Sequence, residues 1–167
     1  KDRIRRNAKL KIDYYFFTDD NFSRNPDWQE ILDALIALRR EEGIPIQFMM
    51  QIDTLAYRIP GFVEKAAEAG CSQVFIGMET LNQENLPAAG KSQNKVGDYR
   101  RMIDAWHAQG IACHVGYIIG FPFDTVESVR EDVRRLKEEI GVDQASFFML
   151  TPLPGSQDHR QMQARGQ

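Results

Sequence analysis

Oxygen-bearing polar side chains follow three apolar stretches of this chain, each at a point where a β-strand would end. In chain order they are Asp19, Asp20, Asn21, Gln51, Asp53 and Glu79. Such side chains accept hydrogen bonds from an ammonium group or ligate a hard cation. A carboxylate, which has two acceptor oxygens, also suits the diol of a ribose. The three strand ends are therefore candidates for binding groups of this kind.

Each of these residues also has an ordinary structural explanation. Asp and Asn favour the turns that lead into helices, so the segment 19–21 could be such a turn. Gln51 and Asp53 point the same way, because they are two residues apart on a strand, but they could merely cap the next segment. Glu79 could be exposed to solvent, since burying an unpaired carboxylate is costly. Taken singly, these residues leave both interpretations open.

The most distinctive segment is 116–122, with the sequence Gly-Tyr-Ile-Ile-Gly-Phe-Pro. Its two glycines bracket Ile118 and Ile119, and glycine allows a flat ligand to approach the backbone closely. Asp124 and Thr125 then begin a predicted helix, where an acidic side chain suits the helix dipole. Ordinary helix capping is the alternative explanation for both residues, and it is the one we expect for Thr125.

Two cysteines, Cys71 and Cys113, are too few for a disulfide framework, and their scarcity fits a reducing cytoplasm. Cys71 is expected just before its strand and Cys113 at the start of another, so both should lie at the edge opposite the polar strand ends. Cys113 and His114 lack a second pair at metal-ligand spacing, and His107 falls on a predicted helix. We therefore expect buried structural thiols and no metal ligands.

The elements that must position these residues alternate regularly. Strands are predicted at 11–17, 46–51, 73–78, 112–119 and 145–150. Four intervening helices are indicated by apolar residues at helical spacing, the first with Asn25 as its cap and Pro26 at its first position. Helical crossovers imply parallel strands, so the predicted fold class is α/β, either a partial (β/α) barrel or a doubly wound sheet. In both, ligands bind at the carboxyl ends of the strands.

Length and charge narrow the class of protein further. A chain of 167 residues is one domain, and we expect residues 1–156 to form it and 157–167 to be a polar, loosely ordered tail. Tyr14, Phe16 and Phe48 are core candidates. A net charge of −3 favours neither nucleic acid nor an anionic membrane as a partner. No signal peptide or apolar run of ~18 residues occurs, so a cytoplasmic location is expected.

In their order, the motifs resemble the radical S-adenosylmethionine (SAM) superfamily, most closely its cobalamin-associated branch. Segment 18–22 (Thr-Asp-Asp-Asn-Phe) looks like that branch's second-strand motif, and 76–80 (Ile-Gly-Met-Glu-Thr) looks like its fourth-strand motif. Segment 120–125 looks like "Gly-x-Pro-x-Glu-Thr", with Asp in place of Glu. Segment 151–156 looks like the "Pro-x-Pro-Gly-Thr" after strand six. The resemblance runs from about Lys11 to Ser156.

The resemblance implies a TIM-barrel-like core of six βα units, of which this chain would supply strands two to six. In the family, a reduced [4Fe–4S] cluster cleaves SAM to a 5′-deoxyadenosyl radical that abstracts hydrogen from substrate. The Cys-x3-Cys-x2-Cys triplet that holds the cluster is absent here. We therefore expect a fragment whose cluster loop precedes Lys1, and which binds no cluster and is inactive alone. Cobalamin, if used, would be held by another domain.

The resemblance also implies which residues contact SAM. Asp20 and Asn21 would lie near the methionyl amino group, and Glu79 with Gln51 would hold ribose or methionyl polar atoms. Segment 118–120 would line the adenine. The full set is Asp20, Asn21, Gln51, Asp53, Glu79, Ile118, Ile119, Gly120 and Leu150, the last through its backbone at the adenine edge. No catalytic side chain and no metal ligand is assigned.

Two other functions are open at this point. A self-sufficient βα-barrel lyase would use a lysine at a strand end, whereas Lys91 and Lys95 lie in a loop, solvated or within reach of a carboxylate. A non-catalytic binding module on a degenerate barrel would also lack the triplet. Whichever holds, we expect a small-molecule ligand whose identity and reaction the sequence does not specify. An exposed edge at strand 11–17 further predicts dimerisation or aggregation.

Overall fold

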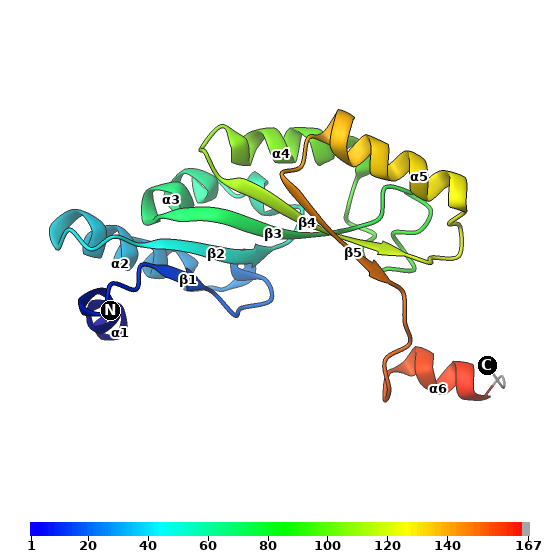
Figure 1. Ribbon diagram of the computed structural model, residues 1–167, viewed down its shortest axis with the longest axis horizontal. Coiled ribbons are helices and arrows are strands. Elements are labelled where there is room, and N and C mark those ends of the chain that lie inside the picture. The colour runs from blue at the N-terminus through cyan, green and yellow to red at the C-terminus, as the bar shows by residue number, and fades with distance from the viewer. Residues whose placement is uncertain (165–167) are drawn as a thin grey trace.

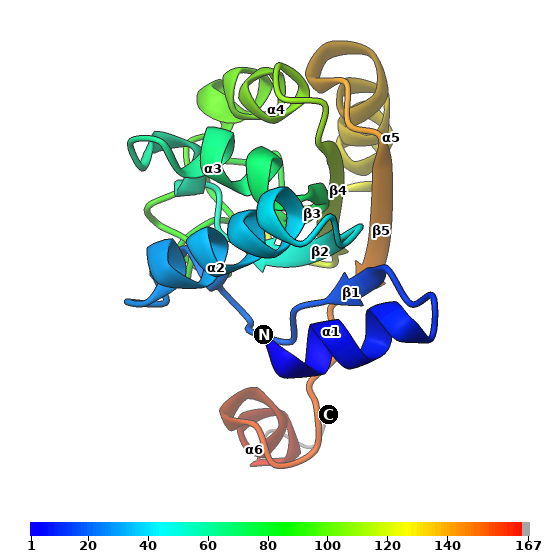
Figure 2. The same cartoon turned by 90° about the vertical axis from the view of Figure 1, so that its left-hand side faces the viewer.

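The computed structural model describes residues 1–164 as a parallel sheet with most of its helices on one side (Figure 1). The strands are β1 (Tyr14–Phe16), β2 (Gln47–Ile52), β3 (Cys71–Glu79), β4 (Ala112–Ile119) and β5 (Gln144–Met149). They pair in the order β1-β2-β3-β4-β5, all parallel. The sheet curls so that one face is concave, which makes it a half-barrel (Figure 2). The α/β partial barrel predicted from the sequence is therefore confirmed.

The helices connect successive strands, as right-handed parallel crossovers require. The connecting helices are α2 (Trp28–Glu41), α3 (Phe62–Ala69), α4 (Tyr99–His107) and α5 (Val126–Arg135), whereas α1 (Asp2–Lys9) precedes β1 and α6 (Gln157–Ala164) follows β5. A π-helical turn, Leu136–Ile140, extends α5 to Gly141, which adopts a left-handed conformation. Short 3-10 turns occupy Phe22–Arg24, Ala56–Arg58 and Val96–Asp98.

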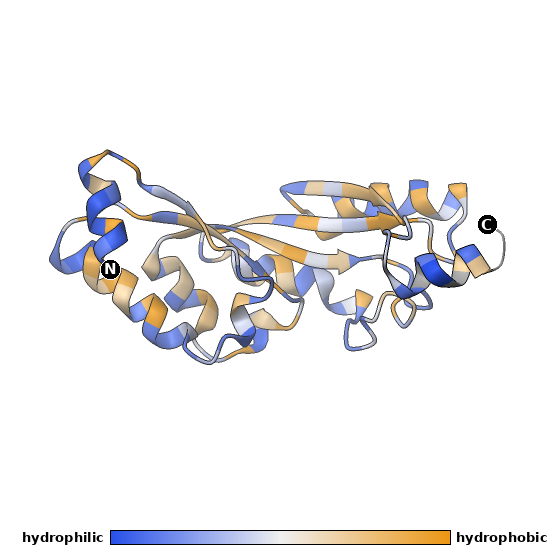
Figure 3. Ribbon diagram, turned by 90° about the horizontal axis from the view of Figure 1, so that it is seen from below, coloured by the Kyte–Doolittle hydropathy of each residue, from blue (hydrophilic) through white to orange (hydrophobic). Residues whose placement is uncertain are grey.

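The core lies between the sheet and α2–α5, because side chains alternate along each strand. In β3, Val74, Ile76 and Met78 are fully buried against the helices, whereas Phe75 and Gly77 face the concave side. Hydrophobic and hydrophilic residues are interspersed along the strands and helices (Figure 3).

Among the core predictions, Phe48 is buried as expected, but Tyr14 and Phe16 are about half exposed. These two predictions were wrong because both side chains point to the concave face, away from the helices.

Several boundaries differ from the sequence prediction, each for a local reason. The first strand has three residues instead of seven, because the backbone N–H groups of Leu10, Lys11 and Ile12 bond back to the end of α1. Helix α2 begins at Trp28 with Asp27 as N-cap, since the Asn25 side chain accepts a hydrogen bond from the N–H of Asp27. Cys71 is the first residue of β3 and does not precede it.

The two ends of the described chain are both helical. The basic start forms α1, which has no buried residue, and α6 covers most of the expected polar tail and stands apart from the sheet (Figure 1). Residues 165–167 of that tail lie outside the described part. None of the helices within residues 1–164 is long and apolar enough to cross a membrane. Both β1 and β5 are sheet edges, and dimerisation through an edge stays a prediction.

Candidate functional site

A cavity of about 180 Å3 opens at the carboxyl edge of the sheet, where β1, β2 and β3 end. We call it the rim cavity. Its lining residues are Asp20, Asn21, Gln51, Ile52, Asp53, Phe75, Gly77, Glu79 and Lys91. The structure thus brings together five polar residues that the sequence analysis singled out on three separate segments. The lysine joins them from the loop after β3.

The segment after β1 divides into structural and cavity-facing residues. Asp19 accepts hydrogen bonds from the Asn21 N–H (3.0 Å) and from the side-chain amide of Asn25 (3.0 Å). It therefore forms the turn that Asp and Asn commonly make. Asp20 and Asn21 line the rim cavity, and Asp20 is exposed to solvent.

Asp53 is buried and its two carboxylate oxygens are both engaged. One oxygen accepts from the amide of Asn21 (3.1 Å) and from Arg24 (2.8 Å), and the other accepts from the N–H of Leu55 (2.9 Å). Burial alone would raise the pKa of Asp53, but these hydrogen bonds outweigh it and lower that pKa. The charged carboxylate of Asp53 therefore serves mainly to hold together the loops after β1 and β2. It is less available as a hydrogen-bond acceptor for a ligand.

Glu79 has a strained backbone at the end of β3. Its φ is +69°, in the left-handed region that residues other than glycine rarely adopt. The pairing of β3 with β4 shifts register between Gly77 and Glu79, and the hydroxyl of Tyr99 donates to the intervening Met78 carbonyl (3.1 Å). Strain of this kind persists where surrounding contacts enforce it and is common at ligand sites.

The Glu79 carboxylate is positioned over the rim cavity by two neighbours. Lys91 Nζ lies 3.2 Å from Glu79 Oε1, and both side chains are partly buried. A Cβ atom at Gly77 would lie 2.7 Å from the same oxygen. Glycine is therefore required at position 77 if the carboxylate is to stay in this place.

The turn after β4 is held by a side-chain clamp. Asp124 accepts hydrogen bonds from the N–H groups of Gly120 (2.8 Å) and Phe121 (2.9 Å) through one oxygen. Its other oxygen accepts from the amide of Asn85 (2.7 Å), and Asn85 in turn accepts from the N–H of Phe123 (3.1 Å). Asp124 thus shapes the turn, and the capping explanation that the sequence left open for it does not hold. Sequence reasoning missed Asn85, which has no motif signal.

Thr125 caps α5 in a reciprocal pair with Ser128, as predicted. The predicted apolar positions 118–120 and Leu150 form a second part of the same edge, outside the rim cavity. The N–H of Leu150 donates to the Ile119 carbonyl (2.7 Å). A Cβ at Gly120, whose φ is +114°, would lie 3.3 Å from Leu150 Cβ.

The two cysteines lie at the opposite, amino-terminal edge of the sheet. Cys71 opens β3 and Cys113 is the second residue of β4, so both lie at the edge where they were expected. Both are buried free thiols, and burial raises the pKa of each to about 12. Neither thiol lines the rim cavity.

Curated proteins with similar sequences are methyltransferases. The bacteriochlorophyllide d C-12(1)-methyltransferase of Chlorobaculum tepidum is 27% identical over 161 residues, which cover 95% of this chain and 33% of that protein. The C-8(2)-methyltransferase of the same organism is 28% identical, over 96% of this chain and 34% of that protein. The chain therefore spans about a third of the length of these relatives.

Solved structures share the fold. The radical SAM methyltransferase TsrM from Kitasatospora setae, determined with cobalamin and a [4Fe–4S] cluster bound, aligns with a TM-score of 0.75. The alignment covers 91% of this chain and 30% of TsrM, at 21% sequence identity. The family model described as "Radical SAM superfamily" matches residues 1–136. This chain accordingly belongs to the radical SAM superfamily.

Proposed function

We propose that this chain supplies the SAM-binding rim of a cobalamin-dependent radical SAM methyltransferase. The observation that carries the proposal is the rim cavity, where acceptor side chains from three strand ends converge with one lysine. The strained backbone of Glu79 supports a ligand role for its carboxylate. Family membership and the methyltransferase relatives supply the ligand and the reaction class.

The polar groups of the rim cavity complement the amino-acid end of SAM. Asp20 and the side-chain oxygen of Gln51 suit its ammonium, and Asn21 can donate or accept beside them. Lys91 suits its carboxylate. Glu79 suits the ribose diol or the ammonium, and it now pairs with Lys91. Ligand entry would replace that ion pair by two contacts with the opposite ends of a zwitterion.

The second part of the edge complements the adenine. Ile118, Ile119 and Leu150 offer an apolar surface, and Gly120 leaves the backbone accessible to a flat ring. Asp124 and Asn85 do not line the rim cavity, yet they fix the turn that carries Gly120. In this proposal they are positioning residues.

The residues of this chain do not fit a [4Fe–4S] cluster. Such clusters are held by cysteine thiolates, whereas Cys71 and Cys113 are buried at the edge opposite the rim cavity. The proposal therefore assigns the cluster and cobalamin to parts of the protein outside these 167 residues, and the substrate is a small molecule. Anaerobic reconstitution of this chain alone should give neither a stoichiometric cluster nor SAM cleavage.

Saturation-transfer NMR with the purified chain tests SAM binding, because it detects weak ligands. We expect transfer to both the adenine and the methionyl protons of SAM. The variant Glu79→Gln should weaken it, whereas Glu84→Gln, an exposed acid outside the rim cavity, should not. Absence of transfer to SAM in the wild type would favour a non-catalytic module on the same barrel.

A further inference from the structure

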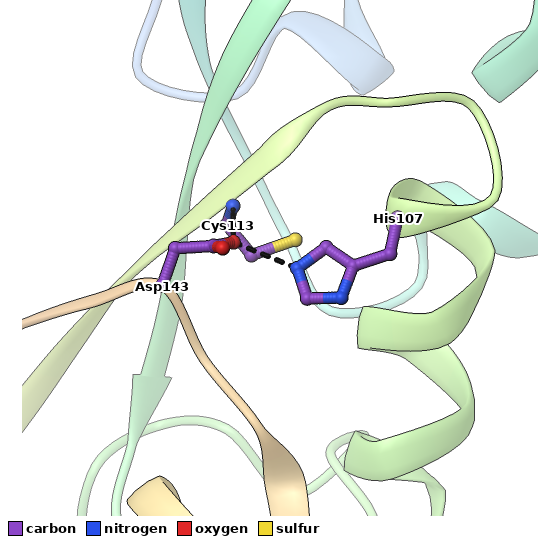
Figure 4. Close-up of side chains that lie close together, drawn as sticks. All are labelled: His107, Cys113 and Asp143. Atoms are coloured by element: carbon purple, nitrogen blue, oxygen red, sulfur yellow. Dashed lines mark hydrogen bonds and ion pairs between the residues drawn. The ribbon is translucent and has the colours of Figure 1, made fainter.

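Three side chains with metal-ligating atoms meet at the amino-terminal edge of the sheet (Figure 4). His107 ends α4, Cys113 lies in β4, and Asp143 immediately precedes β5. One ligand atom from each lies within 4.8 Å of the other two. The imidazole Nε2 of His107 and a carboxylate oxygen of Asp143 are 2.7 Å apart. The thiol of Cys113 points toward the His107 ring.

His107 and Cys113 lie in regular secondary structure, and hydrogen bonds hold Asp143 beside Cys113. The backbone N–H of Cys113 donates to Asp143 Oδ2 (2.7 Å), and the N–H of Asp143 donates to the Cys113 carbonyl (3.2 Å). These bonds fix the thiol relative to the carboxylate as β4 and β5 begin to pair. Helix α4 ends beside them and delivers His107. Ligands on packed elements are positioned more accurately than ligands on loops.

The donor set indicates which ion would bind. A thiolate, an imidazole and a carboxylate are the three ligand types that Zn2+ takes in proteins. The thiolate and the carboxylate together balance the charge of a divalent ion. A thiol that coordinates such an ion loses its proton outright, so the buried neutral Cys113 is compatible with ligation.

The distances permit a tetrahedral site after a small movement. Zinc–ligand bonds of ~2.0–2.3 Å place neighbouring ligand atoms roughly 3.3–3.8 Å apart. His107 and Asp143 must separate slightly and Cys113 must approach, each by about an ångström. His107 and Asp143 can make this adjustment because their side chains are 37% and 47% exposed.

A fourth ligand position would be open to water. A cavity of about 260 Å3 adjoins the cluster and is lined by His107, Gly110, Ile111, Ala112 and Asp143. It supplies both an entry path for the ion and room for a water ligand. Three protein ligands and one solvent ligand is the arrangement found in catalytic zinc sites.

We propose that His107, Cys113 and Asp143 form a Zn2+ site that ties α4 to the start of β4 and β5. The site lies at the sheet edge opposite the rim cavity and is independent of SAM binding. This inference departs from the expectation of no metal ligand. The expectation rested on spacing in the sequence, whereas the fold joins residues that are 30 and 36 positions apart.

Cobalt substitution tests the proposal directly. The purified chain, kept reduced and freed of metal, would be titrated with Co2+ and followed by absorption spectroscopy. We expect a saturable thiolate-to-cobalt charge-transfer band in the near ultraviolet, tetrahedral visible bands, and displacement of both by Zn2+. A wild-type chain that gives no saturable band would overturn the proposal.

Matched variants identify the ligands. Asp143→Asn and His107→Ala, at partly exposed positions, should each weaken Co2+ binding about tenfold or more, the range seen even for indirect metal partners. Cys113→Ser should abolish the charge-transfer band. Cys71→Ser and His114→Ala, which remove the other thiol and the neighbouring imidazole, should leave the titration unchanged.

A fold check separates lost ligands from lost structure. Circular dichroism of each variant reports misfolding, and the two partly exposed variants decide the question if Cys113→Ser does not fold. Zn2+ should also raise the melting temperature of the wild type in a concentration-dependent way, and it should raise that of Asp143→Asn by less at the same Zn2+ concentration. A band that survives Asp143→Asn and His107→Ala unchanged would contradict the assignment.

Discussion

The side-chain amide of Asn21 donates a hydrogen bond of 3.1 Å to the carboxylate of Asp53, 32 positions further along the chain. The reverse contact also exists, since the Asn21 side-chain oxygen accepts from the Asp53 N–H (3.3 Å). Together they join the loop after β1 to the loop after β2. These contacts therefore organise one wall of the rim cavity, and in the proposed site Asp53 would act on a ligand through Asn21.

Replacement of Asp53 should destabilise the fold. Asp53→Ala leaves the amide of Asn21, the N–H of Leu55 and the guanidinium of Arg24 without their acceptor. We expect a loss of about 1–3 kcal/mol in the free energy of unfolding, the usual cost of unsatisfied buried polar groups. Urea denaturation measures it. Asp20→Ala, at an exposed neighbour in the same cavity, should change stability by no more than ~0.5 kcal/mol, and an equal loss in both would contradict the role given to Asp53.

The contribution of Asp53 should disappear in acid. Its hydrogen bonds lower its pKa in the folded protein below the ordinary 3.8. A carboxyl group with a depressed folded pKa stabilises the fold above its unfolded pKa, and this stability is lost as pH falls through the folded pKa. The difference in unfolding free energy between wild type and Asp53→Asn should thus be constant near neutral pH and shrink below about pH 4. A difference that grows on acidification would refute this account.

Local signals allowed much of the fold to be predicted from the sequence. The strand 112–119 and the Thr125 cap depend on residues that are close together in the chain, and both were predicted correctly. Placing polar residues at strand ends was enough to bring Asp20, Gln51 and Glu79 to one edge, because parallel strands share a direction.

The side-chain contacts that could not be predicted from the sequence join residues that are far apart in the chain. Asn85 reaches Asp124 and Asp143 reaches Cys113 only because β3, β4 and β5 lie side by side, and no spacing rule announces such pairs. The left-handed backbone of Glu79 was also unforeseen, since alternating hydrophobicity carries no information on a register shift at a strand end.

The strain at Glu79 can be measured with two substitutions that both remove the carboxylate. Only Glu79→Gly removes the strain of the left-handed backbone, which stabilises the folded protein by ~1–2 kcal/mol. Glycine also gives the unfolded chain more conformational freedom, which lowers the free energy of unfolding by ~0.5–1 kcal/mol. We therefore expect Glu79→Gly to be more stable than Glu79→Ala by about 0.5–1 kcal/mol. At Gln73, which pairs regularly with both neighbouring strands, the alanine variant should be the more stable one. Urea denaturation of the four variants measures which of glycine and alanine is the more stable residue at each position. If alanine is the more stable residue at both positions, strain at Glu79 is excluded.

Lys91 should determine affinity for the carboxylate of SAM and for no other part of it. Lys91→Met keeps the length of the side chain but removes the ammonium that now lies 3.2 Å from Glu79. We expect about tenfold weaker SAM binding, equivalent to ~1.4 kcal/mol, with adenosine binding unchanged because adenosine has no carboxylate. Ligand titrations followed by NMR measure both.

Salt and a neighbouring lysine provide the controls for Lys91. The difference between wild type and Lys91→Met should narrow at high ionic strength, because the site is open enough to solvent for screening to act. Lys91→Arg should restore most of the affinity by restoring the charge. Lys95→Met, an exposed lysine that does not line the rim cavity, should bind SAM like the wild type. An equal loss of adenosine binding in Lys91→Met would instead indicate that the loop carrying Lys91 had moved. That result would contradict the proposed contact between Lys91 and the carboxylate of SAM.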